Sequence, residues 1–379
     1  QPSLEMTALF RKMPHKGVVL PNRVLSWDPL FFKINLNHEE NETSLDNNTL
    51  NLTEDEISTR QAQLLVYAKE PSNSDNFVFR PMTAEGVSSG GGLCNDRFYV
   101  DEHGYDALAF SESGRFYYSD KDVRFDQTNM FGYANAHANW ILSLDSATKW
   151  YGPRVGLVTV HPDYGAQTAV YLPASEFNPN AEIRLGPGGG VNLQNLRHDS
   201  DVIAHELGHH RIYRRLTSTQ GEAAYLHEGI SDIYLGCRTG DPCLGESICP
   251  VGSKNCNDGF KCLRNADNGI TYRENAYYFK DGVRIHRRHK KAQIISGLGW
   301  DIAKKIGCVP LSSIVDRSVD YLAPHSGIIT WLKALLLADK ELNGGKNACL
   351  IADSAKARGF EPMLESANIN CTDYVVPTP

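Results

Sequence analysis

The spacing of hydrophobic residues changes along the chain, from short apolar runs in the first half to helical periodicity in the second. The short runs are rich in β-branched and aromatic residues and are separated by turn-forming residues, which predicts strands. The predicted strands lie at 29–36, 62–68, 76–82, 155–161, 168–173 and 181–186, and a hairpin is predicted over 107–119.

Apolar residues that recur three and four positions apart predict helices. The predicted helices span 134–152, 200–216, 222–236 and 292–307, and the periodicity of 325–358 predicts two more. Asp199 or Ser200 fits the N-cap of the helix at 200–216. Strands first, a long helix across the middle and helices afterwards predict a two-lobed α+β fold, with the central helix at the floor of a cleft.

Three regions follow from this order of elements. Residues 1–90 are predicted to form a β-rich N-terminal region of unknown role, and the glycine-rich stretch at 88–93 is the predicted linker. Residues 91–216 are predicted to form an α/β lobe that ends in the central helix. Residues 217–379 are predicted to form a mainly helical lobe, with a cysteine-rich insertion at 237–262.

The composition is that of an ordinary soluble globular protein, with 41% hydrophobic and 22% charged residues among 379. The formal net charge of -7 gives no reason to expect nucleic acid or an anionic membrane as a partner, and the basic run at 284–291 is the local exception. No stretch approaches eighteen uninterrupted apolar residues, so no membrane-spanning helix is predicted. We expect a monomer.

The chain has nine cysteines, and five of them lie in one loop-like stretch rich in glycine, proline and asparagine. These five are Cys237, Cys243, Cys249, Cys256 and Cys262. No C-x-x-C pair is present, which favours disulfides over a zinc site. Disulfides predict a secreted or otherwise exported protein, and the odd count leaves at least one thiol free or paired outside the chain.

The predicted central helix contains the stretch VIAHELGHH, with two histidines four residues apart. Residues four apart lie on the same helix face, so His205 and His209 can offer two imidazoles to one Zn²⁺. Glu206 is rotated away from that face and can act on a water molecule as general base. Two surface histidines are the alternative, but apolar neighbours such as Ile203 and Leu207 predict a buried helix, in which imidazoles need partners.

A catalytic zinc needs a third protein ligand, and the next predicted helix supplies one. Glu228 follows His209 with eighteen residues between them. Asp232 lies four residues later, on the same face, where it can accept the N–H of His205 and fix its tautomer. His227 could support the site in a similar way, or be an ordinary polar residue near a helix end.

The motif HELGH followed by HEGISD resembles that of the gluzincin metallopeptidases, in particular their thermolysin-like and fungalysin-like branch. The resemblance covers about residues 95–365 and leaves residues 1–90 unplaced. It implies a thermolysin-like two-lobed fold and a secreted endopeptidase that acts on proteins or peptides. It also implies one catalytic Zn²⁺ held by His205, His209 and Glu228, with Glu206 as the base.

Further roles come from this resemblance residue by residue. The stretch TAVYLP, which includes Ala169, corresponds to an edge strand that pairs with substrate. Arg264 in CLRNAD corresponds to an arginine that contacts a substrate carbonyl, with a simple salt bridge as the alternative. His289 corresponds to a histidine that stabilises the oxyanion, with His286 as the fallback and a basic surface patch as the alternative.

The same resemblance raises the possibility of a second metal, Ca²⁺. Asp201 matches an aspartate that helps to bind calcium in thermolysin-like proteins. Asp241 and Glu246 lie in the cysteine-rich segment, near the place where the family has calcium ligands. Ordinary loop acids are the alternative for both residues.

The sequence departs from the family pattern at the second oxyanion donor. That donor is a tyrosine in the family, and its position falls near Gln220 here; Tyr272, Tyr277 or Tyr278 could replace it, or His289 could act alone. The eighteen residues between His209 and Glu228 also fit the aminopeptidase branch of the family, although the G-x-M-E-N motif of that branch is absent. A zinc-bearing binding or adhesion module without turnover is the second alternative.

Overall fold

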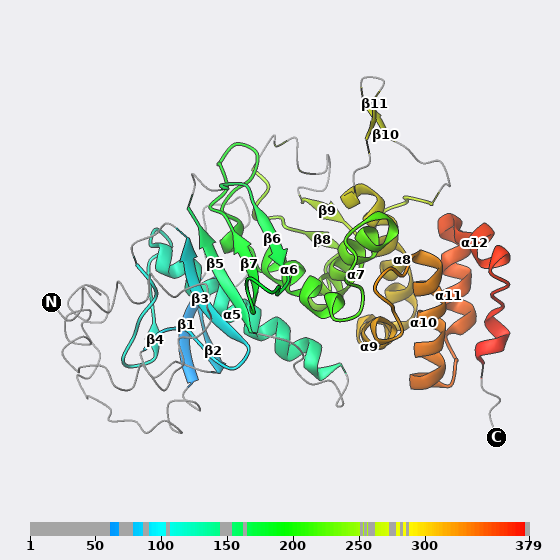
Figure 1. Ribbon diagram of the computed structural model, residues 1–379, viewed down its shortest axis with the longest axis horizontal. Coiled ribbons are helices and arrows are strands. Elements are labelled where there is room, and N and C mark those ends of the chain that lie inside the picture. The colour runs from blue at the N-terminus through cyan, green and yellow to red at the C-terminus, as the bar shows by residue number, and fades with distance from the viewer. Residues whose placement is uncertain are drawn as a thin grey trace. The chain divides into compact units, whose positions relative to one another are not determined.

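The computed structural model of the chain is a mixed α/β structure (Figure 1). It describes residues 61–67, 79–85, 91–103, 107–144, 154–161, 165–250, 253, 256, 262–272, 278–280, 283–285 and 288–375. The strand predicted at 29–36 lies outside these residues. The predicted boundaries at 90 and 216 stay predictions.

The chain divides into two compact units. Unit 1 comprises Gln1–Asn139, Gly152–Glu206 and Gly245–Asn255. Unit 2 comprises Trp140–Tyr151, Leu207–Leu244 and Cys256–Pro379.

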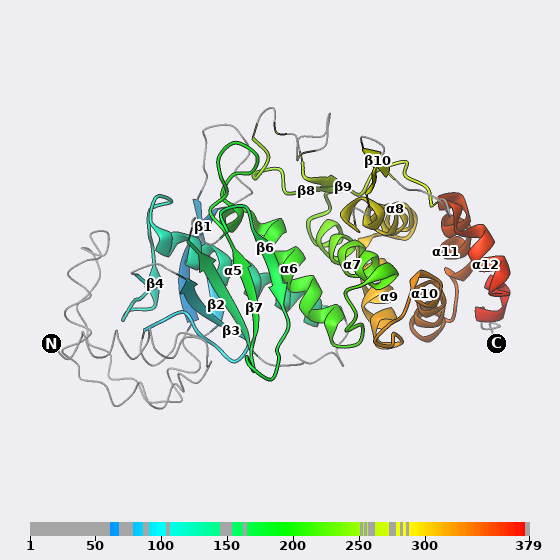
Figure 2. The same ribbon diagram turned by 45° about the horizontal axis from the view of Figure 1, so that its top comes forward.

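Unit 1 contains a four-stranded sheet in the order β3-β5-β7-β6, which Figures 1 and 2 show side by side. Strands β3 (Phe98–His103), β5 (Val155–Val160) and β7 (Ala181–Leu185) are parallel, and β6 (Ala169–Leu172) pairs antiparallel with β7 at the edge. Every residue of β5 is buried, as its unbroken apolar run predicts for a central parallel strand. The strands predicted at 155–161, 168–173 and 181–186 are confirmed.

A second sheet of unit 1 has the order β2-β1-β4. Strand β1 (Gln61–Tyr67) confirms the strand predicted at 62–68, and β2 (Phe79–Glu85) overlaps the strand predicted at 76–82. The hairpin predicted over 107–119 is wrong. Phe110 forms a bridge with Gly92, whereas β4 (Arg115–Phe116) pairs in parallel with β1, so the two arms bond to different partners.

Helix α5 (Val123–Ser143) begins well before the predicted start at 134. Asp122 starts it by accepting the Arg124 N–H through Oδ1 at 2.9 Å. The first half of the helix buries polar residues, and Asn129, for example, donates to the carbonyl of Arg197 at 2.9 Å. These buried polar positions hide the apolar periodicity from which a helix is predicted.

Helix α6 (Ser200–Tyr213) confirms the predicted central helix, and Asp199 is its cap. The Asp199 carboxylate accepts the N–H groups of Asp201 and Val202 at 2.9 and 3.1 Å. In unit 2, Arg211 in the last turn of this helix forms a buried ion pair with Asp316, with Nε to Oδ1 at 2.7 Å. Tyr234 donates to the same carboxylate at 3.0 Å.

The core of unit 2 is helical. Its helices are α7 (Gly221–Thr239), α8 (Arg288–Ile306), α9 (Cys308–Asp320), α10 (Ile328–Asn343), α11 (Ala348–Ala355) and α12 (Glu361–Ser366). Its short strands are β8 (Cys243–Leu244), β9 (Arg264–Asn265), β10 (Tyr278–Lys280) and β11 (Val283–Ile285). Helix α7 packs closely on α8, since a Cβ at Gly229 would lie 2.4 Å from that of Ile295. Helix α9 is not among the predicted helices.

The prediction of disulfides in the cysteine-rich segment is confirmed. Cys243 is bonded to Cys262, and Cys249 and Cys256 are also in disulfide form. A further disulfide joins Cys349 to Cys371 near the C-terminus. The free thiols are Cys94, Cys237 and Cys308, so Cys237 is the exception within the segment. Among the described helices, none is long and apolar enough to cross a membrane.

Burial of Asp101 on β3 predicts a dependence of stability on pH. Burial raises the pKa of its carboxyl to about 7, although a hydrogen bond from the Glu102 N–H opposes the rise. The folded state therefore binds more protons than the unfolded state between about pH 4 and pH 7, so the free energy of unfolding falls as pH rises through that window. We expect Asp101→Asn to flatten the fall and to raise the free energy of unfolding at pH 8 by ~1–4 kcal/mol.

Urea unfolding between pH 4 and pH 8 measures this effect. Asp96→Asn is the matched control, because the Asp96 side chain is 84% exposed. If the free energy of unfolding fell with pH as steeply in Asp101→Asn as in the parent chain, the prediction would be contradicted.

Candidate metal centre

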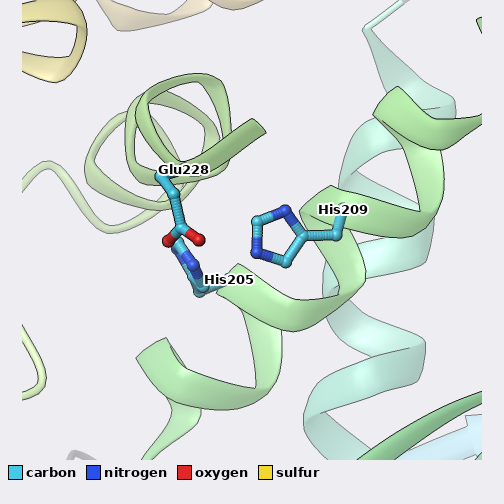
Figure 3. Close-up of side chains that lie close together, drawn as sticks. All are labelled: His205, His209 and Glu228. Atoms are coloured by element: carbon cyan, nitrogen blue, oxygen red, sulfur yellow. The ribbon is translucent and has the colours of Figure 1, made fainter. Parts of the chain in front are cut away.

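Helices α6 and α7 bring three predicted metal ligands together (Figure 3). The ligand atoms of His205, His209 and Glu228 all lie within 4.8 Å of one another. His205 and Glu228 are buried and His209 is half-buried. Within the part of the chain that the structure describes, this is the one group of at least three such side chains so close together.

The chemistry of the three donors fits zinc. Two imidazole nitrogens and one carboxylate oxygen are ligands of catalytic zinc sites, which keep a fourth position open for water, whereas structural sites have four protein ligands. Glu206 directly follows His205 and is buried, at 6% exposure. Because consecutive helix residues point in different directions, Glu206 lies outside the ligand face and remains available to the open position.

Close helix packing makes this convergence possible. A Cβ at Gly208 would lie 2.7 Å from the Ser231 Oγ and 3.0 Å from the Ser231 Cα. Only glycine therefore allows α6 to approach α7 this closely. Gly208 thus has a steric role in placing the two histidines opposite Glu228.

Ser231 is a site residue that the sequence analysis missed. Its Oγ is hydrogen-bonded to the Nδ1 of His209 at 3.3 Å, and its side chain is fully buried. A partner on Nδ1 leaves Nε2 of the imidazole for a metal and fixes the orientation of the ring. The available signal was weak: Ser231 lies three residues after Glu228 and therefore shares its helix face.

His227 has a structural role in addition to its place beside the site. Its Nε2 donates to the carbonyl of Leu216 at 2.7 Å, and its ring centroid lies 5.7 Å from that of His209. The structure thus gives His227 a backbone partner just past the end of α6 and places it inside α7, buried, and not near a helix end as the alternative interpretation had it. Its predicted support of the metal centre stays a prediction.

The structure places His289 at the candidate metal centre. The Nε2 of His289 lies 3.3 Å from the Oε2 of Glu228, and the His289 side chain is 52% exposed. His289 is the second residue of α8, which packs against the α7 helix that carries Glu228. This position is compatible with the predicted stabilisation of an oxyanion. The fallback, His286, lies outside the described residues.

Asp232 forms a two-pronged ion pair with Arg264 of β9. The Nη2 and Nε of Arg264 donate to the two carboxylate oxygens of Asp232 at 2.8 and 2.9 Å. The salt-bridge alternative for Arg264 is therefore the arrangement that the structure shows. The predicted contacts of Arg264 with substrate and of Asp232 with His205 stay predictions.

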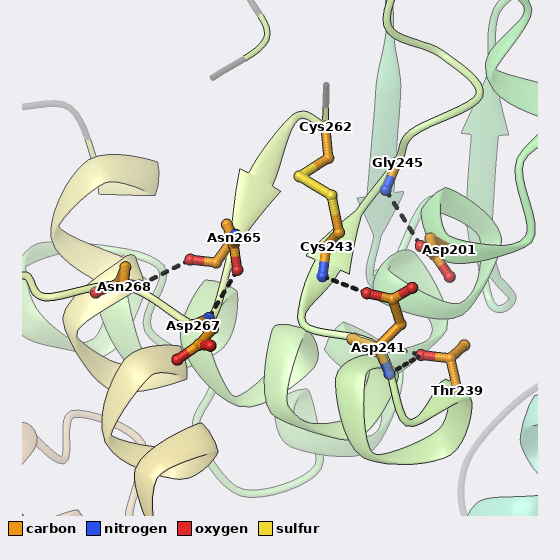
Figure 4. Close-up of a disulfide and its surroundings, with 9 residues drawn as sticks. All are labelled: Asp201, Thr239, Asp241, Cys243, Gly245, Cys262, Asn265, Asp267 and Asn268. Carbon is orange, nitrogen blue, oxygen red and sulfur yellow. Dashed lines mark hydrogen bonds between the residues drawn. A yellow bond between two sulfur atoms is a disulfide. The ribbon is translucent and has the colours of Figure 1, made fainter. Parts of the chain in front are cut away.

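The three predicted calcium ligands have hydrogen-bonding roles that Figure 4 partly shows. Asp201 accepts the Gly245 N–H at 3.2 Å, and Asp241 accepts the Cys243 N–H at 2.9 Å. Glu246 is half-buried, and the Cys249 N–H donates to its carbonyl at 3.2 Å. These contacts stabilise the cysteine-rich segment, and calcium binding stays a prediction.

The remaining predicted residues concern substrate. Ala169 begins β6, the edge strand of the four-stranded sheet, so its pairing with a substrate stays a prediction. Tyr272 packs its ring on Phe360 with centroids 5.1 Å apart, which gives it a structural role. Tyr277 lies outside the described residues. Tyr278 belongs to β10.

Comparisons with known proteins add little to this geometry. No family model matches the sequence, and no curated protein matches it. Among solved structures, the precursor of protealysin, a metalloproteinase from Serratia proteamaculans, aligns at 13% identity and a TM-score of 0.48. The alignment covers 89% of this chain and 96% of that chain. At this level of similarity, the functional interpretation depends on the site residues themselves.

Proposed function

We propose that this chain is an exported zinc-dependent endopeptidase of thermolysin-like architecture. The observation that carries the proposal is the convergence of His205, His209 and Glu228 within 4.8 Å, directly beside Glu206. Two histidines, one glutamate and an adjacent carboxylate are the set that hydrolytic zinc sites use. The disulfides support the proposal of an oxidising, extracellular or periplasmic environment.

The proposed catalytic roles are supported by the positions of the side chains. When bound, zinc supplies Lewis-acid chemistry that acidifies water and polarises a carbonyl. Glu206 takes a proton from the attacking water and delivers it to the leaving amine nitrogen. His289, when protonated, donates to the negative charge that develops on the carbonyl oxygen. Ser231 holds the His209 ring in place.

The proposed substrate is an extended protein or peptide segment. Edge strand β6, which begins at Ala169, offers backbone groups for strand addition, a mode of recognition in which main-chain hydrogen bonds supply the affinity. Arg264 is proposed to contact a substrate carbonyl in addition to Asp232. Because its guanidinium has five N–H donors, the ion pair does not exhaust its capacity.

Metal analysis joined to a cleavage assay tests the proposal. We expect about one zinc per chain and cleavage of casein and of a blocked fluorogenic peptide, with both lost to a chelator and restored by Zn²⁺. His209→Ala should lose the zinc and the activity, whereas His325→Ala, which removes an exposed histidine, should lose neither.

The other outcomes are equally informative. Zinc without cleavage would favour a binding or adhesion module. Cleavage restricted to peptides with a free N-terminus would favour an aminopeptidase. A chain that binds no zinc would overturn the proposal at its first step.

The contact between Ser231 and His209 predicts a measurable effect on zinc affinity. We expect Ser231→Ala to weaken zinc binding by roughly 10–100-fold, because residues that orient a metal ligand commonly contribute this much. Competition with a chromogenic chelator measures the affinity. Ser296→Ala is the matched control, since Ser296 is equally buried and donates to a backbone carbonyl of α8. Equal zinc affinity in the two variants would contradict the role of Ser231.

A further inference from the structure

Two of the three free cysteines lie against each other in unit 2, although they are far apart in the sequence. Cys237 belongs to the last turns of α7, and Cys308 is the first residue of α9. Helices α7 and α9 pack together, Tyr234 of α7 donates to Asp316 of α9 at 3.0 Å, and each of the two thiols shifts the pKa of the other. Ser312, one turn into α9, donates its Oγ to the Cys308 carbonyl at 2.7 Å, and its hydroxyl also lowers the pKa of the Cys237 thiol. The packing of α7 on α9 therefore brings the two cysteines into the same part of the core.

The two thiols differ in accessibility and in acidity. Cys237 is buried, whereas Cys308 is half-exposed and accessible to a small reagent. The nearby Cys237 thiol lowers the pKa of Cys308 to about 7, although partial burial opposes the change. The nearby Cys308 thiol and burial raise the pKa of Cys237. Cys308 is thus the nucleophile of the pair near neutral pH, since a thiolate and not a thiol attacks disulfides.

We propose that Cys237 and Cys308 form an additional disulfide bond, which joins the end of α7 to the start of α9. Nothing in the sequence pattern alone pairs these two residues, because Cys237 stands at the head of the cysteine-rich segment and Cys308 lies far beyond it. The pairing leaves Cys94 as the odd thiol of the chain. The inference depends on the cysteine geometry and is independent of the proposed peptidase activity.

The bond forms by exchange with a small disulfide such as oxidised glutathione. The Cys308 thiolate attacks one glutathione sulfur, which breaks the glutathione disulfide and releases one glutathione thiolate. Cys237 then loses its proton to the released thiolate and attacks the Cys308 sulfur, releasing the second glutathione as a thiolate that takes a proton from water. Two protein thiols are thereby oxidised by two electrons, and one glutathione disulfide is reduced to two thiols.

This bond would stabilise the helix that carries the candidate metal ligand. Helix α7 contains Glu228 as well as Cys237, and α9 contains Asp316, the buried partner of Arg211 in α6. A covalent link from α7 to α9 thus restrains two of the helices around Arg211. The restraint acts on the unfolded chain as well, since the bond closes a long loop between the two cysteines.

Thiol counting on the full-length folded chain tests the proposal. The chain is incubated with oxidised glutathione, quenched with acid, unfolded and labelled with N-ethylmaleimide. We expect Cys94 alone of the three free cysteines to be labelled, and a non-reducing peptide map to contain one linked pair with Cys237 and Cys308. A chain isolated in the already linked form gives the same map without incubation and supports the proposal equally.

Single-cysteine variants make the test sharper. Cys237→Ser removes the resolving thiol, so Cys308 should accumulate as a mixed disulfide with glutathione. Cys308→Ser should leave Cys237 unmodified in the folded chain because it is buried, and Cys94→Ser is the control that still forms the linked pair. Both Cys237 and Cys308 remaining labelled in the parent chain, or stable glutathione on Cys308 with Cys237 present, would overturn the proposal.

Discussion

Glu206→Gln should lower kcat/KM for an internal peptide bond by roughly 10²–10⁴-fold while the bound zinc stays at the parent level. Glutamine keeps the size and a polar tip, but its amide cannot take a proton from the attacking water. Glu206 is also no member of the His205, His209 and Glu228 ligand group, so its replacement removes no metal ligand. The measurement joins steady-state kinetics on a blocked peptide to zinc analysis of the same sample.

A surface variant separates this effect from a general effect of charge. Glu365 of α12 is exposed, and Glu365→Gln should leave both kcat/KM and zinc content unchanged. If Glu206→Gln retained parent activity with full zinc, the base would have to be another group. If it lost zinc as well as activity, Glu206 would contribute to the metal centre itself, in contrast to the role proposed here.

The three candidate metal ligands could be predicted because helix geometry relates two of them. His205 and His209 are four residues apart, so any helix places them on one face, and Glu228 lies in the next predicted helix. Ser231 could not be predicted in the same way, because a serine within a helix is common and its contact with His209 depends on the approach of α6 to α7 at Gly208. The convergence of two helices depends on tertiary packing, which local sequence patterns do not predict.

The errors in the fold have a similar origin. The arms of the predicted hairpin at 107–119 bond to Gly92 and to β1, partners that lie outside the segment. Helix α5 starts before its predicted position because buried polar residues such as Asn129 interrupt the apolar pattern. In β5 the buried residues form an unbroken apolar run, so the strand is predicted correctly. Where long-range hydrogen bonds hold a segment in place of apolar packing, the spacing of its hydrophobic residues does not predict its structure.

Removing one partner of the ion pair between Asp232 and Arg264 should strongly destabilise unit 2. Asp232 is fully buried and the Arg264 side chain is 11% exposed, so the pair is largely shielded from water. Arg264→Gln removes the cation and leaves the carboxylate buried, which costs about 3–5 kcal/mol in comparable buried pairs. The exposed pair of Lys304 and Asp267 is the matched control, and Lys304→Gln should cost less than about 1 kcal/mol. Urea unfolding measures both free energies.

The double variant Arg264→Gln/Asp232→Asn then separates the stability of the pair from the proposed substrate contact. Replacing both charges leaves two amides that can hydrogen-bond to each other, so we expect the double variant to recover much of the free energy of unfolding lost by Arg264→Gln. If Arg264 also contacts a substrate carbonyl, kcat/KM of the double variant stays below that of Asp232→Asn alone although the fold is restored. If activity returns together with stability, Arg264 only neutralises Asp232, and the substrate carbonyl must be bound by another donor.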